Sequence, residues 1–510
     1  MISPSLRYTT TDSSLEEHLS SKVESEHFII HADKRIEKDK LKLITLDQEF
    51  YYQQLKEYFK EEPKTKINSY IFYDSQQKKK LFGSGAADVA KPWLNSVYVS
   101  IDTWENTLKH EIAHCFTAGF GSGIFKLASG FNPALIEGVA EAADGIYHGN
   151  DIHYLASLAY KNKYRVNLSS VFSSFSFFGS VSTLSYIYSG SFIKYLVDEF
   201  GVQKVKDFYR RGDFNKAFAT NIDSVIDDYN LFLDTLTIYS TKEKANYYFG
   251  RKALISKVCP RYVASELSMG WDYYSSNNYK EAKEIFENVI SKAESYSAII
   301  GLSMIYEDGD SLAKAIELVQ SNLDTFTGTS TEFNLKFQLA ELYVKDDKLE
   351  KAKELYEELA KSKAYRRLEQ LVNTRIALLK NGALKKYVAG SDFDRYEILK
   401  QLNSKKYNYS TIPLMIDLSE RLDEGYQSFL SFFEKDIEVK SEISSYAAYN
   451  LSQYMLKHFD YVKARKMAGI ALRYKSNLNL LYVTKNNFNK ADWFQRNAES
   501  VLQRTKFDIQ

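Results

Sequence analysis

The sequence has little of several features that mark special classes of protein. Its 2 cysteines, Cys115 and Cys259, are too few for a disulfide framework or a zinc–thiolate site. Only 6 prolines stand against 39 tyrosines and 32 phenylalanines, which favours long helices with aromatic packing over disorder. No continuous apolar run approaches about 18 residues, so no transmembrane helix is expected. A net charge of +1 provides no overall attraction to nucleic acid or anionic membranes.

The length of the chain limits the expected number of domains, and its N-terminal residues bear on its location. A chain of 510 residues is too long for one core and predicts roughly two to four domains. The N-terminus lacks the basic head and apolar core of a signal peptide. Two hypotheses on location therefore stay open: the cytoplasm, or an extracytoplasmic region of a longer exported or membrane-anchored protein.

The first hundred residues have the pattern of a small mixed sheet. Residues 1–22 are polar and rich in Ser and Thr, which predicts a flexible lead-in. Strands are expected at residues 27–31, 67–72 and 96–100, the last from its strict alternation. Apolar residues at helical spacing predict a helix over residues 40–59 that packs on the sheet.

A motif of two histidines and a glutamate follows the third expected strand. The segment from Asp102 to Glu105 resembles a capping box, which predicts a helix through His110 and His114 to about Ala118. Histidines at positions i and i+4 project from one helix face and suit two positions of a tetrahedral zinc ion. Glu111 then lies beside the metal, where its carboxylate can take a proton from zinc-bound water and pass it to the leaving amine.

A second helix with two carboxylates is expected after a glycine-containing loop. Asn132 offers an N-cap and Pro133 the first helical position, and this helix carries Glu137 and Glu141. Chance remains an alternative, in which the first helix merely carries two surface histidines.

These two segments together resemble a known family. Residues 110–114 (HEIAH) and residues 132–141 (NPALIEGVAE) resemble the gluzincin zinc metallopeptidases, and in particular their peptidase-MA-like group. The resemblance implies one bound Zn²⁺ ion, with Glu137 as its third protein ligand. It also implies that Glu141 orients a ligand histidine through the free ring N–H. The alternative for Glu141 is a solvated glutamate.

Residues 186–201 resemble the downstream signature of the same group. In gluzincins a tyrosine of this helical region hydrogen-bonds the oxyanion that forms on the scissile carbonyl. Tyr186 is the best positional match and Tyr188 the second, and such a phenol contributes about 2 to 4 kcal/mol to the transition state. The alternative for either tyrosine is simple helix packing.

The resemblance also bears on substrate binding. In this clan, the edge strand before the motif helix binds extended substrate backbone by strand addition, which points to Tyr98 and Val99 as substrate-binding residues. The sequence has no Gly-x-Met-Glu-Asn segment, which usually anchors a free amino terminus. The resemblance therefore favours an endopeptidase over an aminopeptidase.

After about residue 262 the sequence becomes repetitive. A tyrosine is followed by an alanine nine residues later in three successive units: Tyr273 and Ala282, Tyr306 and Ala315, Tyr343 and Ala352. This layout resembles the tetratricopeptide repeat, in which small residues let paired helices approach. A degenerate further unit is expected near residues 451–471. The alternative is a generic array of amphipathic helices.

Together these patterns predict an α+β zincin-like catalytic domain, with a small N-terminal mixed sheet and a helical C-terminal part, before an all-α TPR-like repeat domain. The expected boundaries are 1–22 for the lead-in, 23–250 for the metallopeptidase domain and 251–510 for the repeats. The expected function is zinc-dependent hydrolysis of a peptide or protein substrate, with the repeats binding substrate or a partner protein. The alternative is a catalytically inactive, peptidase-like scaffold that binds proteins. Nucleic acid is not an expected partner.

Overall fold

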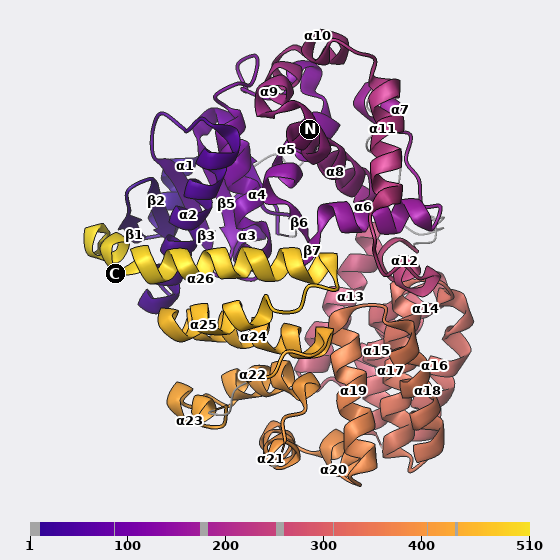
Figure 1. Cartoon of the computed structure of the whole chain (residues 1–510). Coiled ribbons are helices and arrows are strands. Elements are labelled where there is room, and N and C mark those ends of the chain that lie inside the picture. Colours follow the sequence, from indigo (N-terminus) through magenta and orange to yellow (C-terminus); the bar gives the residue numbers. More distant parts are fainter. Residues whose placement is uncertain are drawn as a thin grey trace, which may run out of the picture. The chain divides into compact units, whose positions relative to one another are not determined.

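The structure is a computed structural model of the chain (Figure 1). It describes residues 11–509 except 86, 174–181, 251–259, 310, 405 and 434–436. The chain forms two compact units. The first comprises Met1–Tyr239 with Ser452–Gln510, and the second Ser240–Leu451. Within the described ranges, no helix combines the length and apolar character needed to cross a membrane.

A six-stranded mixed sheet lies at the centre of the first unit. Its order is β4-β5-β3-β2-β1-β8, with bounds Val89–Lys91 (β4), Ser96–Ser100 (β5), Ile67–Phe72 (β3), Phe28–Ala32 (β2), Ser21–Glu24 (β1) and Lys506–Asp508 (β8). The pairs β2–β3 and β3–β5 are parallel, and the outer pairs are antiparallel. The three expected strands therefore form the parallel centre of the sheet.

Helices connect and cover these strands. Because parallel neighbours need a crossover, α2 (Lys38–Phe59) links β2 to β3, and α3 (Ser75–Phe82) precedes the hairpin of β4 and β5. Leu41, Leu46 and Phe50 on α2 are buried, as their helical spacing predicts. The motif helix α4 (Trp104–Thr117) follows β5 and packs against α2.

The structure differs from the flexible lead-in expected for residues 1–22. Thr11 caps α1 (Asp12–His18), with its hydroxyl accepting from the Ser14 N–H. Leu15 and Leu19 are fully buried against aromatic side chains of the sheet. Leu15 and Leu19 therefore anchor α1 to the core, while residues 1–10 lie outside the described part.

A further set of helices follows α4 in the first unit. They are α5 (Pro133–Asp144), α6 (Ile152–Lys161), α7 (Leu168–Ser173), α8 (Ser182–Phe200), α9 (Val202–Arg211), α10 (Phe214–Phe218) and α11 (Ile222–Thr235), with a small hairpin of β6 (Ile146–Tyr147) and β7 (Asn150–Asp151). α5 packs extensively against α8, and α4 packs against α5. Three packed helices thus carry the segments that the sequence singled out.

The C-terminal segment belongs to the first unit, not to the repeats as the expected boundary at residue 251 implied. α25 (Tyr461–Ala471) packs on the long helix α26 (Leu478–Arg504), which lies along α2 (Figure 1). On α26 the Lys490 ammonium forms a buried ion pair with Asp47 of α2, and Trp493 lies 5.7 Å from Phe50 between ring centroids. β8 then pairs with β1 at the edge of the sheet.

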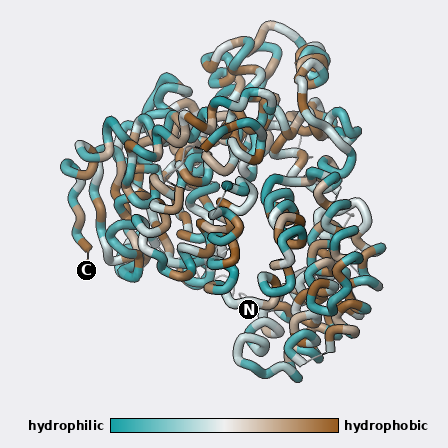
Figure 2. Tube along the Cα trace, turned by 60° about the horizontal axis from the view of Figure 1, so that its bottom comes forward, coloured by the Kyte–Doolittle hydropathy of each residue, from teal (hydrophilic) through white to brown (hydrophobic). Residues whose placement is uncertain are grey.

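The second unit is a stack of helix pairs. Its helices are α12 (Lys242–Phe249), α13 (Pro260–Ser275), α14 (Tyr279–Lys292), α15 (Tyr296–Asp308), α16 (Leu312–Asn322), α17 (Ser330–Lys345), α18 (Leu349–Ser362), α19 (Arg366–Lys380), α20 (Leu384–Ala389), α21 (Asp392–Asn403), α22 (Ile412–Arg421) and α23 (Tyr426–Ser431). α24 (Glu442–Lys457) spans the boundary between the units. Successive helices from α13 to α19 pack on one another. Hydrophilic and hydrophobic residues are interspersed along the described parts of the chain (Figure 2).

The repeat pattern in the sequence is confirmed by these helix pairs. Each repeat tyrosine lies two residues before the end of the first helix of a pair. Its carbonyl accepts from the N–H five residues later, as Tyr343 does from Lys348 at 2.8 Å. Each repeat alanine is buried on the second helix. Phe286 fills the groove, where a Cβ at Gly270 or Gly301 would collide with its ring. The further unit expected at residues 451–471 is likewise a helical hairpin, of α24 and α25.

Candidate functional site

The motif helix forms as expected, but its N-terminus is stabilised differently. The expected capping box is wrong, because Thr103 makes no side-chain cap. Its hydroxyl instead donates to Asp88 at 2.5 Å, and Asp102 accepts from the N–H and hydroxyl of Ser75 at 2.9 Å each. The side chains expected to cap the helix therefore form hydrogen bonds with residues that are distant in the sequence.

The carboxylates of α5 are held by a close helix crossing. Asn132 caps α5 by accepting from the Leu135 N–H at 3.2 Å, as the sequence predicts. A Cβ built on Gly190 of α8 would lie 2.5 Å from Cβ of Glu141, so only glycine allows this approach. At Gly138 of α5 the approach is less close, since a Cβ there would lie 3.1 Å from Ser189 of α8.

Replacing Gly190 by alanine is expected to lower the free energy of unfolding by about 1–3 kcal/mol, because the added methyl group overpacks this crossing. Chemical denaturation followed by circular dichroism measures the change. Gly469→Ala on α25 is the matched control, since its Cβ meets only ordinary contacts. That control is expected to be stabilising by about 0.5–1 kcal/mol, and equal destabilisation by the two variants would contradict the close packing at Gly190.

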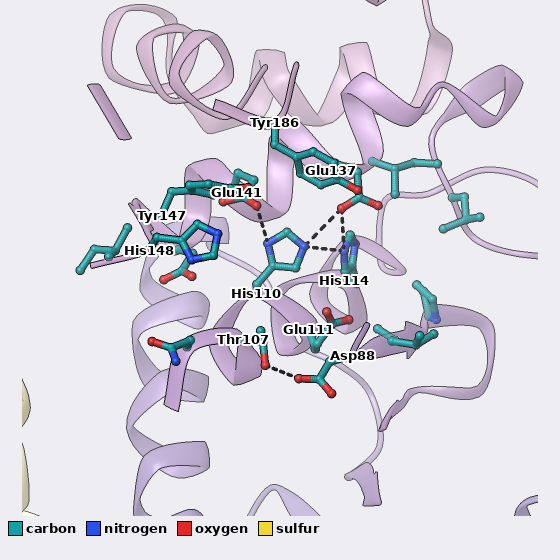
Figure 3. A pocket seen from close by; sticks show the side chains of 18 of the residues that line it. Asp88, Thr107, His110, Glu111, His114, Glu137, Glu141, Tyr147, His148 and Tyr186 are labelled. Carbon is teal, nitrogen blue, oxygen red and sulfur yellow. Dashed lines mark hydrogen bonds and ion pairs between the residues drawn. The ribbon is translucent and has the colours of Figure 1, made fainter. Parts of the chain in front are cut away.

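Three of the predicted side chains meet at one point (Figure 3). In the part of the chain that the structure describes, one group of potential metal ligands has its ligand atoms within 4.8 Å of one another: His110, His114 and Glu137. The two Nε2 atoms of the histidines are 3.2 Å apart, and Oε2 of Glu137 lies 3.3 Å from His110 and 3.8 Å from His114.

This donor set fits a zinc ion. Bonds of about 2.0–2.1 Å in a tetrahedral site place neighbouring ligand atoms about 3.3 Å apart. Two of the separations in the structure, 3.2 and 3.3 Å, match that spacing, and the third, 3.8 Å, is somewhat longer. Two imidazole nitrogens and one carboxylate oxygen are also a typical ligand set of catalytic zinc, with the fourth position left open.

Glu141 lies behind the histidine pair, as the resemblance implied. Its Oε1 is 3.4 Å from Nδ1 of His110, the ring nitrogen that points away from His114. Burial raises the pKa of Glu141 to about 8. Burial lowers the pKa of His114 to about 4 and opposes protonation of His110, but at His110 the carboxylates of Glu141 and Glu137 prevail and raise the pKa to about 10.

Glu111 lies beside the three-residue cluster, not in it (Figure 3). Glu111 and the three cluster residues line one cavity, which has a volume of about 450 Å³. Burial raises the pKa of Glu111 to about 7. A carboxyl group with this pKa exchanges protons readily near neutral pH.

The two candidate tyrosines of α8 have different surroundings. Tyr186 lines the cavity beside Glu137, and burial followed by the nearby carboxylates raises its pKa, so its hydroxyl is neutral at neutral pH (Figure 3). The Tyr188 hydroxyl donates to the carbonyl of Tyr164 at 2.7 Å, in the core. Of the two candidates, only Tyr186 therefore faces the cluster.

The expected edge position of Tyr98 and Val99 is wrong. β5 has β3 on one side and β4 on the other, and both side chains are fully buried. The Tyr98 ring stacks on neighbouring aromatic rings, and its hydroxyl donates to Asp12 at 2.7 Å. The edge strand next to β5 is β4, whose residues Val89 and Ala90 line the cavity.

Sequence reasoning missed part of the cavity lining. Trp93 follows β4, and Tyr147 and His148 lie at the β6–β7 turn. His148 lines the cavity but is not part of the close cluster. No local pattern in the sequence brings these segments to α4, because each reaches the cavity through tertiary packing.

Comparisons with known proteins add little. No model of a known protein family matches the sequence, and no curated protein matches it. One similar solved structure is a tetratricopeptide repeat protein from Parabacteroides merdae, 15% identical, with 46% of this chain and 99% of that chain covered and a TM-score of 0.21. A TM-score this low supports no conclusion, so the repeat architecture rests on the helix pairs themselves.

Proposed function

We propose that the chain is a zinc-dependent peptidase whose site lies in the first unit, and that its helical repeats bind substrate or a partner protein. One observation carries the proposal. His110, His114 and Glu137 converge at the separations that a tetrahedral zinc ion needs, and Glu111 faces the same cavity.

Each residue of the site would have a distinct role. His110, His114 and Glu137 would hold the ion, and Glu141 would orient His110. When bound, zinc would supply Lewis acidity to activate water and polarise a peptide carbonyl. Glu111 would accept the proton of the attacking water on its carboxylate and deliver it to the leaving amine.

Two further elements would act on the substrate. The neutral hydroxyl of Tyr186 would donate a hydrogen bond to the oxyanion that develops on the scissile carbonyl. The exposed edge of β4 would pair with the backbone of an extended peptide. An endopeptidase is favoured, since the sequence lacks the Gly-x-Met-Glu-Asn segment that anchors a free amino terminus.

A second candidate function is a scaffold that binds proteins without cleaving them. The stacked helix pairs of the second unit favour it, because such repeats usually bind peptides or other proteins. Cleavage of a quenched peptide library by the full-length chain and by Glu111→Gln separates the two. Glu111-dependent cleavage supports the peptidase, whereas bound zinc without cleavage in either protein favours the scaffold.

Replacing Glu141 by glutamine is expected to weaken zinc binding by about 10- to 100-fold, because the amide no longer supports His110 as a carboxylate does. Competition with a chromogenic chelator measures the zinc affinity. Asp198→Asn is a control in the same unit, on α8 and outside the cavity lining. An unchanged affinity in Glu141→Gln would contradict the role of this carboxylate.

A further inference from the structure

A short hairpin between α4 and α5 holds two large apolar side chains in solvent. Ile124 is 83% exposed and Phe125 39% exposed. The Ser122 N–H donates to the carbonyl of Leu127 at 2.8 Å and closes the hairpin. At Gly121 a Cβ would lie 2.0 Å from the Lys126 carbonyl oxygen, so the turn is tight. The hydrogen bond and the close contact at Gly121 therefore hold the backbone of this hairpin in a tight turn.

Aromatic contacts join this hairpin to the cavity. The Phe125 ring packs edge-on against Trp93, with centroids 5.2 Å apart, and lies 5.9 Å from Phe131, which is 54% exposed. Trp93 itself lines the cavity of the candidate metal site. Phe125 thus joins Trp93 to Phe131, and Ile124 precedes Phe125 at the tip of the hairpin. We call these four residues the apolar rim, which reaches the wall of the cavity at Trp93.

Such exposure has a cost that binding would recover. Leaving a large apolar side chain in water forgoes about 1.5–3 kcal/mol of burial free energy. Apolar patches that border a cleft commonly mark a site where a ligand or protein binds. The cavity wall extends the rim with the apolar side chains of Leu127 and Ile136.

The position of Trp93 indicates the kind of ligand. Trp93 follows the edge strand β4 with one residue between them, so an extended peptide paired with β4 passes beside the rim. The tip of the hairpin contributes a single cation, Lys126. A surface that recruits anionic membranes typically carries several clustered cations.

We propose that the apolar rim binds an aromatic or large aliphatic side chain of an extended peptide, next to the peptide bond at the candidate metal site. This inference rests on the proposed peptidase function and names its substrate class. The substrates are extended protein segments with large apolar residues beside the cleaved bond.

Binding is tested without cleavage in full-length, zinc-loaded Glu111→Gln protein. The probes are a fluorescein-labelled Gly/Ser peptide with a central Leu-Phe-Leu block and the same peptide with Ser in that block. Fluorescence anisotropy is expected to show tighter binding of the apolar probe, weakened about tenfold by adding Ile124→Ser and Phe125→Ser. Leu231→Ser is the matched control, since Leu231 is 66% exposed on α11 and lies outside the cavity lining. The control is expected to leave binding unchanged.

Several outcomes overturn the inference. Equal binding of the two probes does so, as does unchanged binding in the double variant or in Ile124→Ser alone, which alters only an exposed side chain. The inference is also overturned if the double variant keeps its affinity for the peptide but no longer binds phosphatidylcholine vesicles. The same holds if it keeps that affinity but no longer self-associates in light scattering. If the wild type cleaves no peptide but peptide binding still depends on the rim, the peptidase proposal fails and the rim is still a binding site for apolar side chains. If the wild type cleaves peptides without preference for apolar residues, the peptidase proposal holds and the inference about the apolar rim fails.

Discussion

The Glu111→Gln variant is expected to lose about 10²- to 10⁴-fold in kcat/KM for peptide hydrolysis while it keeps its zinc. Glutamine has nearly the same shape as glutamate, but it cannot accept the proton of the attacking water at neutral pH. Glu111 lies outside the three-residue ligand cluster, so the metal should remain bound. Initial rates on a quenched peptide, together with zinc analysis of the same sample, measure both properties.

Glu105→Gln provides the matched control for this prediction. Glu105 lies on the same helix, and its carboxylate is about half exposed in an ion pair with Lys457. The control is expected to retain full activity and zinc. Wild-type rates in Glu111→Gln would contradict the assigned role of Glu111, whatever the zinc content.

The second large effect is expected from His114→Ala. This substitution removes one of only three protein donors in the cluster, so zinc affinity should fall by more than the about 10- to 100-fold expected for Glu141→Gln. His114 is buried, with its Nε2 turned towards His110. Zinc content after dialysis against a weak chelator measures the loss, and circular dichroism checks the fold.

His148→Ala tests whether any histidine of the cavity would give the same result. His148 lines the same cavity at the β6–β7 turn but stands outside the ligand cluster. This variant is expected to keep its zinc. If His148→Ala loses its zinc and His114→Ala retains it, the metal site lies in a different part of the cavity.

The elements that the sequence predicted well depend on local patterns. Helical spacing located α2, alternation located β5, and Asn132 with Pro133 located the start of α5. Within α4, the spacing of His110 and His114 alone places both rings on one face. These inferences need only neighbours along the chain, and the structure confirms the elements.

What the sequence could not predict depends on tertiary partners. β5 was expected to be an edge strand, but the three residues of β4 cover it, and so short a strand gives little signal of its own. The capping box expected from Asp102 to Glu105 does not form, because Asp102 accepts hydrogen bonds from Ser75 and the Thr103 hydroxyl donates to Asp88. Alternation along a strand shows which side chains share a face, not how many strands lie beside it.

The domain boundary failed for a similar reason. α26 is amphipathic and follows a helical hairpin, so its sequence pattern does not distinguish it from the repeats. Its place in the first unit depends on the buried pair of Lys490 and Asp47, which are far apart in the sequence, and on β8 pairing with β1. Patterns of neighbouring residues in the sequence do not predict such long-range pairings.

Zinc content tests the central claim most directly. Full-length protein is purified without chelators, supplied with zinc, passed through gel filtration, and analysed for metal beside His114→Ala. The convergence of His110, His114 and Glu137 predicts about one zinc ion per chain, which His114→Ala loses. A folded wild-type protein that retains no zinc would contradict the claim that this cluster is a metal site.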